Sequence, residues 1–393
     1  MKSTLLVVSA AERRRRIGIR HLLLPGTRVD DVADIADAVV ALHSSDPVTV
    51  PLSIAARHQE PTIELIDRAL HESGTLVRHH GMRRTLWVMT PEVAGVAHAA
   101  STRKLSEAER RKSIAFLDGD AAWLDAATDA VCALLATTDP LSTRDICLRL
   151  PEFDRQIVRP APAGRVATQS GLSRVVLQAG FDGRLVRGRP LGSWVSSQHT
   201  WTVPEQSVHF ERDIDVATGA AAMTRGLLMQ FGPMTETDIA WWGGWTKAQT
   251  RAALAAVAAE EVDLPDSGTG HTGWVLPGDG EPTDECEPWV AVLPGLDPTA
   301  MGWKQREWYL DASTAKRVMD TNGNIGPTLW ADGRIVGGWV QRPDGSFATE
   351  FTTPVGQEHR RLLAAEIERI RAFVGETRFK VRFPSANQRD LLS

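Results

Sequence analysis

The stretch that decides the fold is Pro140-Leu141-Ser142-Thr143-Arg144-Asp145-Ile146, because its pattern returns farther along the chain as Pro233-Met234-Thr235-Glu236-Thr237-Asp238-Ile239. Each copy predicts a turn followed by a helix. The hydroxyl residue, Ser142 or Thr235, stands where a side chain caps the first helical amides, and the aspartate three residues later favours the positive end of the helix. A repeat of this kind indicates that the chain contains copies of one structural unit.

A second repeat extends this unit. Gly74-Thr75-Leu76-Val77-Arg78 corresponds to Gly183-Arg184-Leu185-Val186-Arg187, and each copy follows a segment with the apolar spacing of an amphipathic helix. The apolar residues of the two segments are Leu65, Ile66, Ala69 and Leu70, and Leu172, Val175, Val176 and Ala179. Residues 76–89 and 185–203 then have the character of hairpins with basic residues near the tip. Two helices followed by a basic hairpin are the elements of a winged helix.

A third copy begins at Thr235 and continues through an Ala-rich helix near Arg251 to Glu260. It ends in a Gly-rich hairpin at residues 268–276. We therefore predict three tandem winged-helix modules. The predicted boundaries are residues 13–135, 136–220 and 221–284.

Residues 285–393 have a different pattern. Asp332-Gly333 and Asp344-Gly345 separate short runs of β-forming residues, and such dipeptides favour tight hairpin turns. We expect a β-meander or small barrel, followed by a helix at residues 357–375. The apolar face of that helix consists of Leu362, Leu363, Ile367, Ile370 and Phe373. The predicted fold class is thus α+β, with three winged-helix modules and a β-rich, barrel-like C-terminal domain.

The charge distribution separates the two halves of the chain. The net charge is −5, but residues 1–200 contain 26 Lys and Arg against 22 Asp and Glu, whereas residues 201–393 contain 18 against 27. A polyanion should therefore bind the N-terminal half, whose cations are almost all arginine. An alternative cause of the arginine bias is an Arg-rich, Lys-poor proteome encoded by a GC-rich genome.

The composition also excludes several kinds of site. The three cysteines, Cys132, Cys147 and Cys286, form no CxxC pair, so neither a disulfide framework nor a cysteine zinc site is expected. Phosphate-binding glycine motifs are missing, and the histidines are dispersed. No apolar run is long enough to span a bilayer. We expect a cytoplasmic, nucleoid-associated protein that needs no metal and no cofactor.

Two further motifs carry a family resemblance. The segment Gly232-Pro233-Met234-Thr235-Glu236-Thr237-Asp238-Ile239-Ala240-Trp241-Trp242 and the segment Leu293-Pro294-Gly295-Leu296-Asp297, together with tandem winged helices, resemble a bacterial family of winged-helix DNA-binding proteins. Its characterised members, of the AlkZ and YcaQ type, are DNA glycosylases that remove bulky alkylated purines and unhook interstrand crosslinks. The resemblance spans residues 13–375. It implies that the partner is double-stranded DNA, alkylated or crosslinked, and favours a monomer; Asp297 and Trp303 would lie in a cleft.

That family carries a Gln-x-Gln or Gln-x-Asp motif at the end of an early helix. The matching segment here is Ala41-Leu42-His43-Ser44-Ser45-Asp46-Pro47, after a helix expected at residues 30–41. His43 and Ser45 occupy the two catalytic positions, and neither is Gln or Asp. We expect Asp46 to hold the attacking water, His43 to orient it or contact a phosphate, and Ser45 to cap the turn. The alternative is that Asp46-Pro47 is only a helix-ending turn.

Arginines in the predicted hairpins are the candidate phosphate contacts. They are Arg78, Arg83, Arg84, Arg184, Arg187 and Arg189. The function that these residues and the resemblance favour is hydrolysis of the N-glycosidic bond of alkylated purines. The alternative is a non-catalytic winged-helix DNA-binding protein or transcriptional regulator. A glycosylase should expose His43 and Asp46 in a concave cleft, whereas a regulator should present a protruding recognition helix.

Overall fold

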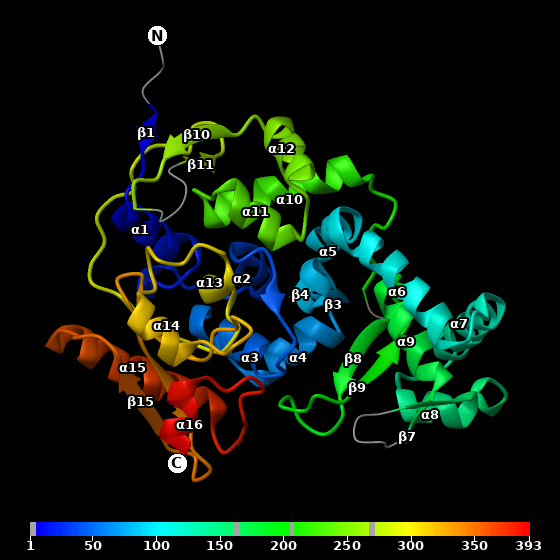
Figure 1. Ribbon diagram of the computed structural model, residues 1–393. Coiled ribbons are helices and arrows are strands. Elements are labelled where there is room, and N and C mark those ends of the chain that lie inside the picture. Colours follow the sequence, from blue (N-terminus) through cyan, green and yellow to red (C-terminus); the bar gives the residue numbers. More distant parts are fainter. Residues whose placement is uncertain (1–4, 161–165, 205–207, 267–271) are drawn as a thin grey trace.

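The computed structural model describes residues 5–160, 166–204, 208–266 and 272–393. The α+β class is confirmed: helices alternate with several small sheets (Figure 1). Within the described ranges the strands form three sheets of three strands, one of four and one of two. The search for a helix that combines the length and apolar character of a bilayer span finds none in these ranges.

One order of elements, helix–strand–helix–helix–strand–strand, occurs in the first part of the chain and again in the second. The first set is α2 (Val32–Ala38), β2 (Leu42–His43), α3 (Thr49–Arg57), α4 (Ile63–His71), β3 (Val77–His80) and β4 (Leu86–Met89), with strand order β2-β4-β3. The second set is α7 (Ala121–Ala136), β5 (Leu141–Ser142), α8 (Thr143–Arg149), α9 (Gly171–Phe181), β8 (Val186–Pro190) and β9 (His199–Thr202), with strand order β5-β9-β8. The hairpin of β6 (Gln156–Pro160) and β7 (Val166–Ser170) lies between α8 and α9.

The third set has the same order, but a single bridge replaces its first strand. Its elements are α10 (Val216–Phe231), the bridge between Met234 and Trp274, α11 (Glu236–Gly243), α12 (Lys247–Ala256), β10 (Glu260–Asp263) and β11 (Thr272–Val275). The antiparallel pair β10–β11 confirms the expected hairpin in its described part, whereas Gly268 lies outside the described residues. The short strand β1 (Leu6–Val7) pairs with β10.

The repeated capping pattern forms as the sequence indicates. Ser142 Oγ accepts a hydrogen bond from Asp145 N at 3.1 Å, and Thr235 Oγ1 accepts one from Asp238 N at 3.1 Å. In return, the side chain of Asp238 accepts a hydrogen bond from the backbone N–H of Thr235, which completes a capping box. These local bonds begin α8 and α11 at corresponding positions of two sets.

The C-terminal part is an open meander and not a barrel. Its elements are β12 (Val290–Leu293), α13 (Pro298–Met301), α14 (Ala312–Val318), β13 (Thr328–Ala331), β14 (Arg334–Gln341), β15 (Phe347–Phe351), α15 (Gln357–Val374) and α16 (Ala386–Leu392). The strand order is β12-β13-β14-β15, so β12 and β15 are the edges of the described sheet. The barrel expectation is wrong because four strands are too few to close, and α15 covers a face of the sheet instead. Both Asp-Gly turns and the terminal helix are confirmed.

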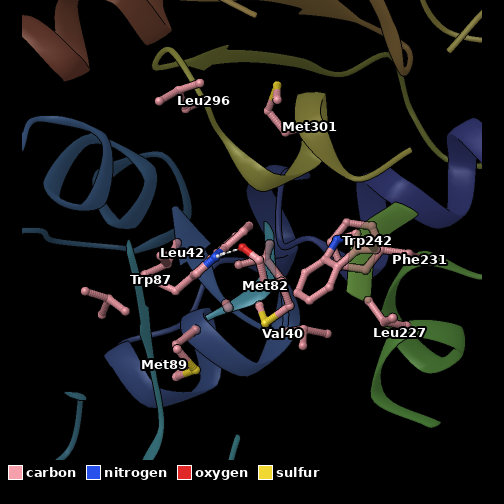
Figure 2. Close-up of a cluster of buried hydrophobic side chains, with 14 of the residues drawn as sticks. Val40, Leu42, Met82, Trp87, Met89, Leu227, Phe231, Trp242, Leu296 and Met301 are labelled. Atoms are coloured by element: carbon pink, nitrogen blue, oxygen red, sulfur yellow. Dashed lines mark hydrogen bonds between the residues drawn. The ribbon is translucent and has the colours of Figure 1, made fainter. Parts of the chain in front are cut away.

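A single hydrophobic core joins the first and third sets to the C-terminal part. Figure 2 shows Trp87 of β4 and Trp242 of α11 in this core, with ring centroids 5.3 Å apart. Between the first and second sets runs a long helical connection of α5 (Pro91–Ala97), η3 (His98–Thr102) and α6 (Arg103–Phe116). The second set has a separate core and lies at the far end of this connection (Figure 1).

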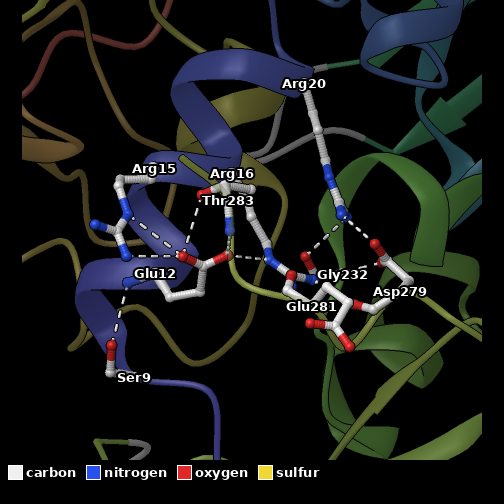
Figure 3. A network of polar contacts seen from close by, with 9 residues as sticks. All are labelled: Ser9, Glu12, Arg15, Arg16, Arg20, Gly232, Asp279, Glu281 and Thr283. Atoms are coloured by element: carbon white, nitrogen blue, oxygen red, sulfur yellow. Dashed lines mark hydrogen bonds and ion pairs between the residues drawn. The ribbon is translucent and has the colours of Figure 1, made fainter. Parts of the chain in front are cut away.

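Arginines of the first helix connect it to residues 279–283. In α1 (Ala10–Arg20), Glu12 accepts hydrogen bonds from Arg16 at 2.7 Å and from Thr283 N at 3.0 Å (Figure 3). Arg20 pairs with Asp279 at 2.5 Å. Because Arg16 is buried and bonded in this network, it is not available to DNA.

Candidate functional site

The segment that matches the family motif begins on a strand. The helix expected at residues 30–41 is shorter: α2 ends at Ala38 and is capped by Asp31, whose side chain accepts from Ala33 N. Val40 then adopts a positive φ of 61°, and the chain enters β2. The expected helix end is wrong because pairing with β4 takes over the backbone bonds of residues 42–44.

The register of the β2-β4-β3 sheet decides which side chains are accessible. His43 lies opposite Trp87, which lies opposite His79. In the next row Ser44 N donates to Leu86 O at 2.8 Å, and Leu86 lies opposite His80. Successive side chains of a strand point to opposite faces. His43 therefore faces the core, whereas Ser44 and His80 face the other side of the sheet.

His43 is buried, with 5% of its surface exposed. Its ring meets that of Trp87 edge to face, with the centroids 4.8 Å apart. Burial, reinforced by the charge of Arg83, lowers the pKa of His43 to about 3. The ring is therefore neutral near pH 7.

Asp46 is also buried, with 2% exposed. Its Oδ1 accepts from Val48 N at 3.3 Å, and its Oδ2 accepts from Arg382 N at 2.8 Å. Burial raises the pKa of this carboxyl, although those two bonds and the Arg382 charge oppose the shift. The expectation that His43 and Asp46 would be exposed in a cleft is wrong, because one packs in the core and the other binds backbone amides. Their roles in catalysis stay predictions.

A cavity of about 310 Å³ lies beside the motif. Segments far apart in the sequence form its wall: the turn after β2, the β3–β4 hairpin, the β8–β9 hairpin and the segment before α16. The polar lining residues are Ser44, Ser45, His80, Arg84, Thr85, Arg187, Ser197, His199 and Arg382. Three residues predicted from the sequence thus come together here, Ser45, Arg84 and Arg187. Among the described residues, the lining contains three arginines and no carboxylate.

The arginines of the cavity are held in different ways. Arg84 pairs with the buried Glu109, while its own side chain stays 46% exposed. Arg187 lies over Trp201, with Cζ 5.0 Å from the ring centroid. Burial, and then the nearby Arg382, lower the pKa of Arg187 to about 10, so it remains charged. The cavity therefore has a positive wall suited to an anion.

Two histidines of the cavity are neutral. Burial lowers the pKa of His80 to about 3, and Arg187 adds to this effect. Burial lowers the pKa of His199 to about 3 as well, with Arg78 and Arg187 contributing. Neutral imidazoles offer hydrogen bonds to a ligand without adding positive charge.

The other predicted arginines lie elsewhere. Arg78 is buried, and its Nη1 lies 3.3 Å from His199 Nδ1. Arg83 stacks on Trp241, with Cζ 3.8 Å from the ring centroid. Arg184 pairs with Asp129 at 2.8 Å, and Arg189 pairs with Asp67 at 2.7 Å and with Glu72. Each of these side chains thus contacts other groups of the protein, Arg83 by stacking and the rest by polar contacts.

Asp297 and Trp303 were expected in a cleft, and this expectation is wrong. Asp297 is fully buried and binds Arg57 at 2.8 Å and 2.9 Å and Ser53 at 2.6 Å. Trp303 is 1% exposed. The carboxylate also accepts from Thr299 N, so it caps α13 as well as compensating a buried guanidinium.

Sequence reasoning missed Arg382, Phe383 and Ser197. Arg382 Nη1 donates to Ser45 O at 3.0 Å, so it belongs to the motif turn although it is distant in sequence. The available indication was the alternation of basic and apolar residues in Arg378-Phe379-Lys380-Val381-Arg382-Phe383. Ser197 had none.

The chain is similar to DNA glycosylases over most of its length. A model of the family described as DNA glycosylase AlkZ-like matches residues 36–373. Among solved structures, the Streptomyces sahachiroi DNA glycosylase AlkZ is similar in fold, with a TM-score of 0.71 and 19% identity, covering 96% of this chain and 99% of that chain. No curated protein matches. Because the family match covers well over half of the chain, this protein belongs to the AlkZ-like DNA glycosylase family.

Proposed function

We propose that this protein hydrolyses the N-glycosidic bond of N3- or N7-alkylated purines in duplex DNA, as a monofunctional glycosylase of DNA repair. The observation that carries the proposal is the cavity beside Ser45, whose described lining residues include three arginines and no carboxylate. Such a wall binds a phosphodiester backbone. We further propose that alkylated or crosslinked DNA is the substrate, that the protein acts as a monomer, and that it works at the nucleoid.

We assign the three repeated sets of elements to winged-helix modules. In each, two helices precede a hairpin, and the first strand, or the bridge at Met234, pairs with the last strand. Winged helices present a helix or hairpin to duplex DNA. The modules would grip the duplex on either side of the cavity.

The chemistry demands little of the protein. A purine alkylated at N3 or N7 is cationic, so the C1′–N bond breaks with its electron pair going to the base. Water adds to C1′ and loses a proton to solvent. The protein needs to position that water and to leave the sugar cation unopposed by positive charge. Neutral His80 and His199 add no further positive charge beside the sugar, and the charges of Arg84, Arg187 and Arg382 would be offset by the DNA phosphate that they bind.

Among the motif residues, Ser45 is the one we assign to the substrate. It is partly exposed and lines the cavity, whereas His43 and Asp46 are buried behind it. We assign to His43 and Asp46 the support of the turn that presents Ser45. This is a positioning role, since neither side chain reaches the cavity.

The test is release of the damaged base from a duplex that carries one N3- or N7-alkylpurine. Alkali-labile abasic sites should accumulate with wild-type protein and not on the unmodified duplex. Arg187→Ala should weaken duplex binding and slow release. Arg184→Ala is the matched control, because Arg184 lies just before strand β8 but pairs with Asp129. Duplex binding without release from any alkylated substrate would instead identify a non-catalytic DNA-binding protein.

A further inference from the structure

The segment between α15 and α16 reaches the motif from the other end of the chain. In Figure 1 it is the orange-to-red stretch that runs from α15 toward α3 and α4. The family match ends at residue 373, so this segment lies beyond it. Its contacts with the cavity therefore lie outside the part of the chain that the family model covers.

Arg382 contacts two successive residues of the motif. Its backbone amide donates to Asp46 Oδ2 at 2.8 Å, and its Nη1 donates to Ser45 O at 3.0 Å. The first contact uses the main chain, so any residue except proline can make it at this position. The second requires a side-chain donor. Together the two bonds close the turn from opposite sides.

The charge of Arg382 acts on the nearby Asp46 carboxylate and lowers its pKa, but the two form no direct ion pair. Of the other arginines of the cavity, Arg84 pairs with Glu109 and Arg187 lies over Trp201. Arg382 lies 5.8 Å from the ring of Phe383, and within the described ranges no carboxylate oxygen is within 4 Å of its guanidinium nitrogens. Its side chain is exposed.

Arg382 also stands between two cavities. Arg382 and Phe383 line both the cavity beside Ser45 and a second one of about 660 Å³. Arg187 faces the first cavity from the opposite hairpin. Two guanidinium groups that converge without a carboxylate favour an anion that accepts several hydrogen bonds, and a backbone phosphate of DNA is such an anion.

We infer that Arg382 is a positioning residue of the excision site, which holds the Ser45–Asp46 turn and, with Arg187, binds the phosphate beside the nucleotide to be cleaved. This inference rests on the proposed function. The part that concerns phosphate is measurable on unmodified DNA, so it can fail or succeed independently of base release.

The experiment compares Arg382→Ala, Arg382→Gln and Arg382→Lys with wild type. In the Ala variant the hydrogen bond from the backbone N–H of residue 382 to Asp46 remains, so the fold should be kept. Its affinity for an unmodified duplex should fall roughly tenfold or more, and the slope of log K against log salt should become shallower by about one. The Gln variant retains a donor for Ser45 O without charge and should show the same change in slope. Lys should restore the slope.

The rate of base excision distinguishes the two proposed roles of Arg382, which are holding the Ser45–Asp46 turn and binding phosphate. On an alkylated duplex the Lys variant should bind as wild type but release the base more slowly, because one ammonium replaces the fork that reaches both Ser45 O and a phosphate. Arg378→Ala is the matched control: Arg378 lies in the same segment and binds Glu376 O at 2.8 Å, away from the cavity.

A salt slope and release rate in Arg382→Ala equal to those of wild type would overturn the inference. Should that variant lose thermal stability, the Arg382→Gln slope decides. If wild type releases no base from any alkylated duplex, the proposed function fails, while the slopes still show whether Arg382 binds phosphate.

Discussion

Asp46 joins segments that are distant in sequence, because its two oxygens accept from Val48 N and Arg382 N. Asp46→Asn replaces one acceptor by an NH₂ group that faces a backbone N–H. We expect a loss of about 1 to 3 kcal/mol of unfolding free energy. Urea unfolding measures it, with the exposed Asp344→Asn as control. Undiminished stability would mean that the turn does not depend on this carboxylate and would contradict the positioning role assigned to Asp46.

Arg57 and Asp297 form an ion pair in which both side chains are fully buried. Asp297→Ala leaves the guanidinium without its charge partner, so we expect a loss of about 3 to 5 kcal/mol. Burial tends to raise the pKa of Asp297, but Arg57 and the hydrogen bonds hold it below its usual value. The contribution of this pKa shift is present above pH 4 and is lost as the pH falls further. Denaturant unfolding at pH 7 tests the variant, and a loss below 1 kcal/mol would contradict this account.

Among the elements, the β8–β9 hairpin makes a contact that the sequence did not predict. Trp194 near its tip packs on Phe373 and Phe379, with ring centroids 6.2 Å apart in both cases. The hairpin thereby bridges the second set of elements to the C-terminal part and closes one side of the cavity.

Trp194→Ala should detach this tip. The apolar contact is worth about 1 to 3 kcal/mol, so amide hydrogen exchange in residues 191–198 should become faster while that of α9 is unchanged. Leu191→Ala is the control, since Leu191 is exposed on the same hairpin. Exchange in residues 191–198 as slow as in wild type would show that the tip is held by other contacts.

Local patterns predicted the elements that local bonds determine. The capped helices α8 and α11 and the Asp-Gly turns form where Ser142, Thr235, Asp332 and Gly345 indicated, and α15 forms where the apolar spacing of residues 357–375 did. The cavity could not be predicted, because it depends on which distant segments meet. Ser45 and Arg187 were identified by motif and repeat, but the register that buries His43 is set by pairing with β4, which the residues around His43 do not reveal.

For the whole molecule, buried neutral histidines predict sensitivity to acid. Burial lowers the pKa of seven histidines among the described residues: His21, His43, His80 and His199 to about 3, His71 and His98 to about 4, and His79 well below its usual value. Unfolded, each would titrate near 6.5. Between about pH 6.5 and 4 the unfolded chain therefore binds more protons than the folded protein. As the pH is lowered through this range, the free energy of unfolding should decrease by at least about 1 kcal/mol per pH unit. Urea midpoints at pH 7.5, 6.5 and 5.5 test this, and equal midpoints would contradict it.

The central claim is that base excision takes place in the cavity beside Ser45. Its most direct test is single-turnover release of one N7-alkylguanine from a duplex by wild type and by Ser45→Phe. Ser45 is partly exposed on the cavity wall, so the phenyl ring should fill the cavity without disturbing the core. We predict release by wild type and at least roughly a hundredfold slower release by the variant, at unchanged melting temperature. Release by Ser45→Phe at the wild-type rate would place the chemistry elsewhere and contradict the account.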